Sequence, residues 1–213
     1  MFGDGALAFR EFIMREPLPL ATIHDAVLEF LRGRDDAVLY GAQAVNAYVE
    51  ESRMTQDVDI LSPRAAELAE EVRSFLHERF KIAVRIRSVA SELGYRIYQV
   101  RKPKNRHLVD VRSVGALPPA ERVEEVLVLA PADLIASKVT ALVQRHARPK
   151  SGTDWRDLAM LLLRFPELKT GSGVVRARLQ AAVAEGEDAR VLEAWRDLAA
   201  QEILPEDDEA EFR

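Results

Sequence analysis

Two aspartates, Asp57 and Asp59, stand on either side of a single valine in the segment "TQDVDIL". Side chains two residues apart on a strand project from the same face, so this spacing would bring two carboxylates together. Adjacent carboxylates repel each other unless a cation compensates their charge. A third aspartate, Asp110, lies in the similar pattern "LVDVR". Three carboxylates on neighbouring strands would form an oxygen-rich site suited to Mg²⁺, and a pair of such ions is a standard clamp for phosphoryl transfer.

These aspartates also allow a simpler interpretation, because an exposed strand face can carry any charged residue. Asp110 could merely pair with Arg106 or Arg112. The segment upstream favours chemistry. The apolar run "DAVLY" ends at Gly41 and Ala42 and is followed by a helical pattern. The start of a helix presents free backbone N–H groups to a ligand, so a triphosphate would fit there, beside the aspartates of the next strand.

The elements that must position these residues can be read from hydrophobic periodicity. Helical spacing occurs in "ATIHDAVLEFLRGR", in "AQAVNAYVEES" and over 64–80. Alternation predicts strands in "DAVLYG", "DVDIL", "KIAVRIRSV", "YRIYQVR", "HLVDVRSV" and "EVLVLA". The remainder is predicted to be helical, in segments near 132–147, 153–164, 173–184 and 188–203. The expected class is therefore α+β, with a mixed sheet flanked by helices over 1–120 and a helical C-terminal domain over 121–213.

The composition is that of a globular protein, with 48% hydrophobic and 31% charged residues. The chain has no cysteine, which excludes disulfides, thiolate metal sites and cysteine nucleophiles. No apolar stretch approaches membrane-spanning length. The segment "MFGDGALAFREFIMREPLPL" lacks the pattern of a secretion signal. We therefore expect a cytoplasmic protein without a membrane partner.

The charged residues are unevenly distributed around a net charge of −5. Residues 185–213 contain eleven acidic residues and three arginines, which predicts a solvated acidic tail. Two basic clusters, "RKPKNRH" (101–107) and "RHARPK" (145–150), are either solvated connections or surfaces for a nucleic acid. The four histidines show no metal-binding spacing, so none is assigned as a ligand: His24, His77, His107 and His146.

The turn and the aspartates together resemble the DNA polymerase β-like nucleotidyltransferase superfamily. Its signature is a hydrophobic residue, a turn of small residues, a helix, an Asp-hydrophobic-Asp motif and a later carboxylate on a strand. The matching segments here are Tyr40-Gly41-Ala42, Asp57-Val58-Asp59-Ile60 and Asp110. The superfamily usually has Gly-Gly or Gly-Ser where this chain has Gly41-Ala42. The run "RMTQDVDI", with Arg53 and Thr55, is similar to bacterial minimal nucleotidyltransferases.

A second segment, "LIASKVTALVQRHARPKSGTDWRDLAMLL", resembles the AbiEii-type nucleotidyltransferases of abortive-infection and toxin–antitoxin systems. The resemblance implies that Lys138 contacts nucleotide phosphates and that Asp157 contributes to catalysis. Arg145 and Lys150 could add contacts to phosphates or to a nucleic acid. Each of these residues could instead be an ordinary solvated charge or a favourable charge at a helix end.

The two resemblances together imply a Mg²⁺-dependent enzyme that transfers a nucleoside monophosphate from an NTP to an acceptor hydroxyl or phosphate. Asp57, Asp59 and Asp110 would bind two Mg²⁺ ions, with Asp157 as a further catalytic residue. The implied nucleotide-binding residues are Gly41, Ala42, Arg53, Thr55 and Lys138. The acceptor could be tRNA, a protein or a small molecule, and a cognate antitoxin is a possible partner. A non-catalytic nucleotide-binding or protein-interaction module and a Mg²⁺-dependent phosphohydrolase are the alternatives.

Overall fold

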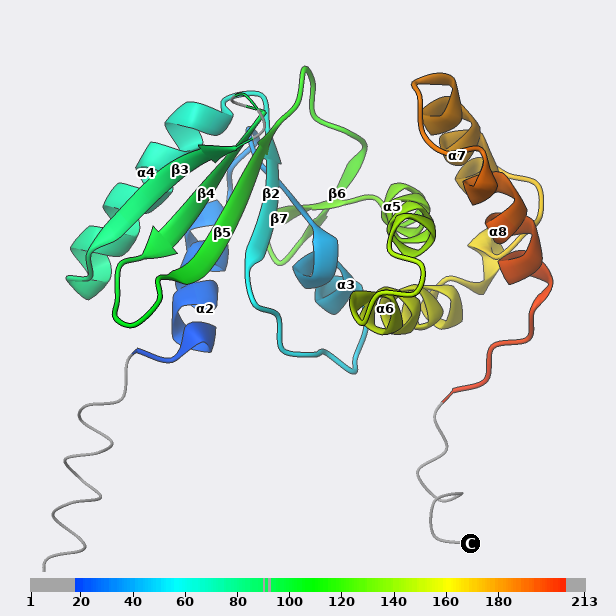
Figure 1. Cartoon of the computed structure of the whole chain (residues 1–213), viewed down its shortest axis with the longest axis horizontal. Coiled ribbons are helices and arrows are strands. Elements are labelled where there is room, and N and C mark those ends of the chain that lie inside the picture. The colour runs from blue at the N-terminus through cyan, green and yellow to red at the C-terminus, as the bar shows by residue number, and fades with distance from the viewer. Residues whose placement is uncertain (1–17, 90, 92, 206–213) are drawn as a thin grey trace, which may run out of the picture.

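The computed structural model describes residues 18–205, except 90 and 92, and consists of a mixed β-sheet joined to a helical part (Figure 1). The helices before and within the sheet are α2 (Leu20–Leu31), α3 (Gly41–Tyr48) and α4 (Ala65–Phe80). The strands are β1 (Val38–Tyr40), β2 (Val58–Ser62), β3 (Val84–Val89), β4 (Gly94–Gln99), β5 (Arg106–Ser113), β6 (Ala120–Val123) and β7 (Val126–Leu129). The helical part comprises α5 (Pro131–Gln144), α6 (Lys150–Arg164), the 3-10 helix η1 (Pro166–Leu168), α7 (Val174–Ala184) and α8 (Arg190–Ala200).

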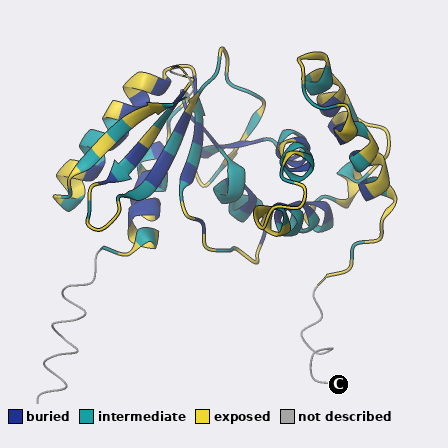
Figure 2. Ribbon diagram, in the orientation of Figure 1, coloured by how far each residue is buried: buried dark blue, intermediate teal, exposed yellow. Residues whose placement is uncertain are grey.

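The seven strands lie in the order β3-β4-β5-β2-β1-β7-β6. The pairs β2–β5 and β1–β7 are parallel, and the other neighbouring strands are antiparallel. Along β2, Val58, Ile60 and Ser62 are buried, whereas Asp59 and Leu61 are only half-buried. This alternation gives the sheet an apolar face for the core and a second face that can carry polar side chains (Figure 2).

The apolar face of the sheet is covered by α4, which packs on β2, β3, β4 and β5. Its buried stripe follows the helical period: Ala65, Leu68, Ala69, Val72 and Leu76. Phe75, beside this stripe, is half-buried, and the centre of its ring lies 5.0 Å from that of Phe30 in α2. This part of the core therefore lies between the sheet and the helices α2 and α4.

The helical part is attached to the sheet directly. Helix α5 follows β7 after one residue and begins with Pro131, a residue favoured at the first position of a helix. Helices α5 and α6 both contact α3, which also packs on β1 and β2. The same apolar core extends into the outer helices, where the indole N–H of buried Trp195 donates to the carbonyl of Thr170 at 3.1 Å. Thus α3 is the element shared by the two parts.

Several expectations need correction. Helix α3 ends at Tyr48, earlier than its pattern suggested, and β2 begins at Val58, so Asp57 lies in the bend before the strand. Strand β6, which was not predicted, forms a hairpin with β7. The sheet continues to Leu129, and the domain boundary at residue 120 stays a prediction. The last residues of the acidic tail, 206–213, and Glu92, between β3 and β4, lie outside the described residues. Across the described ranges, no helix combines the length and apolar character needed to cross a bilayer.

Candidate active site

The predicted carboxylates are brought together by the pairing of β1, β2 and β5. Asp59 of β2 is directly opposite Asp110 in the parallel neighbour β5 and opposite Tyr40 in the antiparallel neighbour β1. Residues opposite each other on adjacent strands share a face, so the carboxylates of Asp59 and Asp110 project together. Asp57, two residues before Asp59, joins them from the bend. The adjacency of the strands that carry Asp59 and Asp110 was expected from the sequence.

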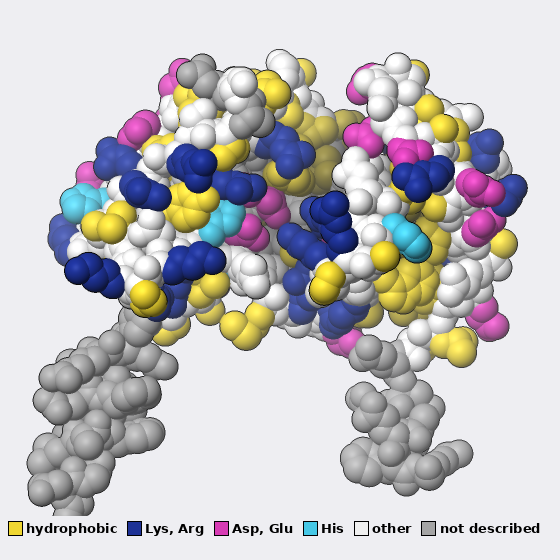
Figure 3. Space-filling view, in the orientation of Figure 1, with side chains coloured by type: hydrophobic (Ala, Val, Ile, Leu, Met, Phe, Trp, Pro, Cys, Tyr) yellow, Lys and Arg dark blue, Asp and Glu magenta, His cyan; other side chains and the backbone are white. Residues whose placement is uncertain are grey.

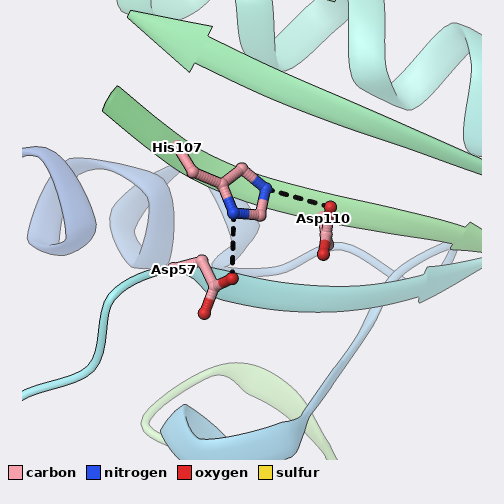
Figure 4. A group of neighbouring side chains, drawn as sticks. All are labelled: Asp57, His107 and Asp110. Atoms are coloured by element: carbon pink, nitrogen blue, oxygen red, sulfur yellow. Dashed lines mark hydrogen bonds and ion pairs between the residues drawn. The ribbon is translucent and has the colours of Figure 1, made fainter. Parts of the chain in front are cut away.

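His107 lies between two of these carboxylates (Figure 4). Its Nδ1 is 3.0 Å from Oδ2 of Asp57, and its Nε2 is 3.0 Å from Oδ1 of Asp110. Residues 107 and 110 would face opposite sides of a regular strand, because their separation is odd. The pairing of β4 with β5 shifts at this point, so that Ile97 is opposite Val109 but Tyr98 is opposite His107. The extra residue in β5 turns the side chain of His107 to the face that carries Asp110.

The electrostatics of the cluster differ from one side chain to the next. The hydrogen bond from His107 lowers the pKa of Asp57. Burial would lower the pKa of His107, but its hydrogen bonds to Asp110 and Asp57 raise it to about 9, so the imidazole is protonated at neutral pH. Burial, followed by the negative charges of Asp57 and Asp110, raises the pKa of Asp59 to about 6. The imidazolium of His107 and the guanidinium of Arg96, which pairs with Asp110, therefore leave the negative charge of the three carboxylates only partly compensated.

Gly41 is the residue on which the geometry of Asp59 depends. It begins α3 with a φ of +72°, a conformation that glycine adopts readily and other residues rarely do. A Cβ at this position would lie 2.2 Å from Oδ2 and 2.8 Å from Cγ of Asp59. The missing side chain thus lets the Asp59 carboxylate lie directly against the start of α3. No side chain of a described residue caps this helix start, so its first N–H groups remain available.

The donor set fits a divalent cation. Ligand atoms from Asp57, His107 and Asp110 all lie within 4.8 Å of one another, and Asp59, outside that group, is opposite Asp110 on the next strand. As an imidazolium His107 has no free lone pair for a metal, so it would have to lose its proton to act as a ligand beside the carboxylates. Carboxylate oxygens are the ligands that Mg²⁺ prefers, whereas an imidazole nitrogen suits Mn²⁺ or Zn²⁺ better. Burial is the main cause of the raised pKa of Asp59, and repulsion from Asp57 and Asp110 adds to it; a nearby cation would relieve that repulsion.

Asp157 forms a second charged group, beside the carboxylates but with different partners. Its side chain is 1% exposed, and it accepts hydrogen bonds from Nε and Nη2 of Arg53 at 2.6 and 2.7 Å. Its Oδ2 also accepts from the ammonium of Lys138 at 2.7 Å. Burial alone would raise the pKa of Asp157, but these two cations hold it below its usual value. The group ties the segment before Asp57 to α5 and α6.

The other predicted residues occupy different surroundings. Thr55 is buried, with its hydroxyl 3.4 Å from Nδ1 of His24 in α2. Arg145 donates to buried Asp154 at 2.8 and 2.9 Å. Lys150 is exposed at the first position of α6, and its charge is felt at both Asp57 and Asp59. Ala42 is the second residue of α3.

Two side chains of the site were missed from the sequence. His107 was not assigned as a ligand, and Arg96 was not considered, yet Nε of Arg96 donates to Oδ1 of Asp110 at 3.1 Å. No local pattern marks either residue, because both reach the site through the pairing of β4 with β5 and its shift. The structure places the predicted Asp57, Asp59, Asp110 and Gly41 together, whereas Arg53, Lys138 and Asp157 form the neighbouring buried group. Their roles in catalysis stay predictions.

Solved structures with the same fold are distant in sequence. JHP933 from Helicobacter pylori aligns with a TM-score of 0.54 at 14% identity, over 84% of this chain and 88% of that one. The polyadenylate synthase of Megavirus aligns with a TM-score of 0.54 at 13% identity, over 69% of this chain. This chain spans only 32% of the length of the viral protein. At such identities the likeness shows the fold alone.

A family model supplies the stronger finding. No curated protein matches the chain. The model described as "Nucleotidyl transferase AbiEii toxin, Type IV TA system" matches residues 25–213, which include the carboxylates, α3 and the helical part. The match confirms the enzyme class expected from the sequence, a nucleotidyltransferase, and the fold expectation of an α+β protein is confirmed as well. The chain therefore belongs to the AbiEii family of nucleotidyl transferases.

Proposed function

We propose that this protein transfers a nucleoside monophosphate from an NTP to an acceptor hydroxyl or phosphate, with pyrophosphate as the second product. One observation carries the proposal: Asp59 lies between Asp110 and the start of α3, in contact with Gly41. A triphosphate bound at that helix start would have its α-phosphate beside the carboxylates. The AbiEii family match supports the same reaction class.

The triphosphate would bind to the first N–H groups of α3, at Gly41 and Ala42. The positive end of the helix dipole favours an anion at this point. Ala42 lacks the hydroxyl of a serine, but its backbone N–H donor is unaffected. Lys150 would add a positive charge from α6, since it already acts electrostatically on Asp57 and Asp59.

Asp57, Asp59 and Asp110 would hold the divalent cation, proposed as Mg²⁺ at two positions. Bound Mg²⁺ would supply charge neutralisation of the phosphates and would lower the pKa of the acceptor hydroxyl. His107 and Arg96 fix the orientation of Asp110 through their hydrogen bonds to its Oδ1. The Asp59 carboxylate lies against Gly41, beside the proposed phosphate site.

In the proposed step, the acceptor oxygen forms a bond to the α-phosphorus while the bond from that phosphorus to the bridging oxygen of pyrophosphate breaks. Asp110 takes the proton of the acceptor hydroxyl as the general base. Pyrophosphate leaves with the electron pair of the broken bond, next to the start of α3. Arg53, Asp157 and Lys138 position the segment that carries Asp57, and the ammonium of Lys138 adds positive charge near Asp59.

The biological role that fits this chemistry is that of a toxin which modifies an acceptor needed for growth. The matched family supports this role, and a cognate antitoxin would then be the natural partner. A cytoplasmic location is proposed with it, because nucleoside triphosphates are the substrates.

The test is label transfer. The protein is incubated with each α-labelled NTP, Mg²⁺ and either total RNA or total protein, beside Asp59→Asn. The exposed Asp35→Asn is the matched control, because it removes the same charge away from the cluster. Transfer by the wild type and by Asp35→Asn, abolished in Asp59→Asn, is the expected result. NTP loss without a labelled acceptor would indicate a phosphohydrolase, and NTP binding without turnover would indicate a non-catalytic module; either outcome refutes the proposal.

A further inference from the structure

Asn46 joins helix α3 to the segment that leads into Asp57. Its Nδ2 donates to the backbone carbonyl of Arg53 at 2.8 Å, and its Oδ1 accepts from the backbone N–H of Arg53 at 3.1 Å. Nδ2 also donates to Oε1 of Gln43, in the preceding turn of α3, at 3.1 Å. Both N–H groups of the amide and its oxygen therefore have partners, and a leucine of similar size could form none of these bonds.

Arg53 is bound through both its backbone and its side chain. Its backbone is held by Asn46 in α3, and its guanidinium donates to the carboxylate of Asp157 in α6 at 2.6 and 2.7 Å. Asp157 in turn accepts from Lys138 in α5 at 2.7 Å. The segment after α3 is thus tied to three helices at Arg53, and Asn46 supplies the tie to the helix that begins at Gly41.

Asp57 depends on this attachment more than the other two carboxylates do. Asp59 and Asp110 lie opposite each other in paired strands, which fix their backbone positions. Asp57 precedes β2, and the segment between Arg53 and β2 belongs to no helix or strand. The Asp57 side chain is 27% exposed, and Figure 3 shows acidic side chains in a hollow with Lys and Arg side chains on both sides. Because packing holds Asp57 only in part, its position is set by the two ends of the segment, β2 and the anchored Arg53.

We propose that Asn46 is a positioning residue, which holds Asp57 where it can share a divalent cation with Asp59 and Asp110. This inference rests on the proposed function and adds a residue that supports its metal site. Asn46 lies five residues after Gly41, which is about 7.5 Å along the same helix. The proposed phosphate site and the attachment of Asp57 are therefore built on one element. Loss of the amide would let the segment move relative to the phosphate site, and a displacement of about 1 Å is enough to impair such a reaction.

The experiment measures binding of Mn²⁺, a paramagnetic substitute for Mg²⁺, from the loss of the EPR signal of the free ion, without NTP. Asn46→Ala and Asn46→Leu both remove the amide, and the leucine keeps its size. Trp195→Phe is the matched control, because it removes a hydrogen bond from a buried side chain to a backbone carbonyl among the outer helices. Changes in the groups that support metal ligands weaken metal binding by about 10- to 100-fold, so the Kd should rise at least about tenfold in both Asn46 variants and stay unchanged in Trp195→Phe. Thermal unfolding establishes that each variant is folded at the temperature of the titration.

Transfer kinetics supply a second measurement. Because Asn46 binds the segment before Asp57 and not the proposed phosphate site, its loss should lower kcat at least about tenfold and leave the KM for the NTP within about twofold. Mn²⁺ binding at the wild-type affinity in either Asn46 variant overturns the role of Asn46 alone, as does an equal loss of binding in Trp195→Phe. Absence of Mn²⁺ binding in the wild type would instead refute the proposed metal site, and the role of Asn46 with it.

Discussion

Two charged clusters lie side by side in this protein and are balanced in opposite ways. Asp57, Asp59 and Asp110 share the imidazolium of His107 and the guanidinium of Arg96, so three carboxylates have two cations and negative charge is left over. Asp157 instead has two cations, Arg53 and Lys138, and is almost completely buried. A buried carboxylate with full hydrogen bonding stabilises the structure around it, whereas a half-buried group with under-compensated charge is prepared for a ligand. From this comparison we propose that the first cluster binds metal and that the second positions the segment before Asp57.

The largest expected effect is on activity, in the under-compensated cluster. Asp59→Asn should reduce nucleotide transfer by roughly 10³ or more, since it removes a ligand that acts on the reacting phosphate. The same change removes one of three mutually repelling charges, so the free energy of unfolding should stay the same or rise. Steady-state transfer and urea unfolding measure the two quantities. If Asp59→Asn lost activity only because it unfolded, Asp59 would have a stabilising role like that of Asp157, and the comparison would be wrong.

In the cluster around Asp157, loss of the carboxylate charge should lower stability. Asp157→Asn leaves Lys138 and Arg53 without their shared counter-charge and should lower the free energy of unfolding by about 3 kcal/mol. Asp154→Asn is the control on the same helix. Its partner Arg145 is 37% exposed on its side chain and can turn to water, so a loss of about 1 kcal/mol is expected. Equal losses in urea titrations would contradict the distinction between the clusters.

Addition of Mg²⁺ should stabilise the protein through the first cluster and not through the second. At a Mg²⁺ concentration 100 times the Kd, the wild type should gain about 2.7 kcal/mol of stability, because the ion binds only the folded state. Asp57→Asn/Asp110→Asn should lose this gain, and Asp154→Asn should keep it. Thermal unfolding with and without Mg²⁺ is the measurement. Stabilisation retained in the double variant would place the ion elsewhere.

The smallest expected effect concerns His24, whose Nδ1 lies 3.4 Å from the hydroxyl of Thr55. Burial lowers the pKa of His24 below 6.5, and its Nε2 has no hydrogen-bond partner among the described residues. Below pH 6.5 the unfolded chain therefore binds a proton that the folded protein does not, so acid lowers stability. The difference in unfolding free energy between the wild type and His24→Leu should be constant above pH 6.5 and change below it, by up to about 1.4 kcal/mol per pH unit. A flat difference down to about pH 5 would show that His24 protonates freely.

The elements with a long hydrophobic period were predictable from the sequence. Helix α4 and the four helices after β7 begin and end within a few residues of their expected bounds, since each buries one continuous stripe. Asp59, Asp110 and Gly41 were found because alternation and a small-residue turn leave a local signal. Strand β6 was missed, because "AERV" is short and does not alternate and is a strand only through its pairing with β7.

The partners within the site could not be predicted in the same way. His107 reaches Asp110 only because the pairing of β4 with β5 slips by one residue. The bond between Arg53 and Asp157 joins residues 104 positions apart. Such contacts depend on how the finished elements pack, and no short window of sequence contains that information.

The contact between Gly41 and Asp59 has a consequence for how such a protein can diversify. The helix start that would receive the nucleotide and the carboxylate that would receive the metal meet at van der Waals distance, with no intervening side chain to absorb a change. A substitution that reshapes the start of α3 therefore displaces the Asp59 carboxylate, and a change at Asp59 likewise displaces the helix start. Selection for a different nucleotide would have to act at residues away from this contact, while the contact itself is inherited as a single unit.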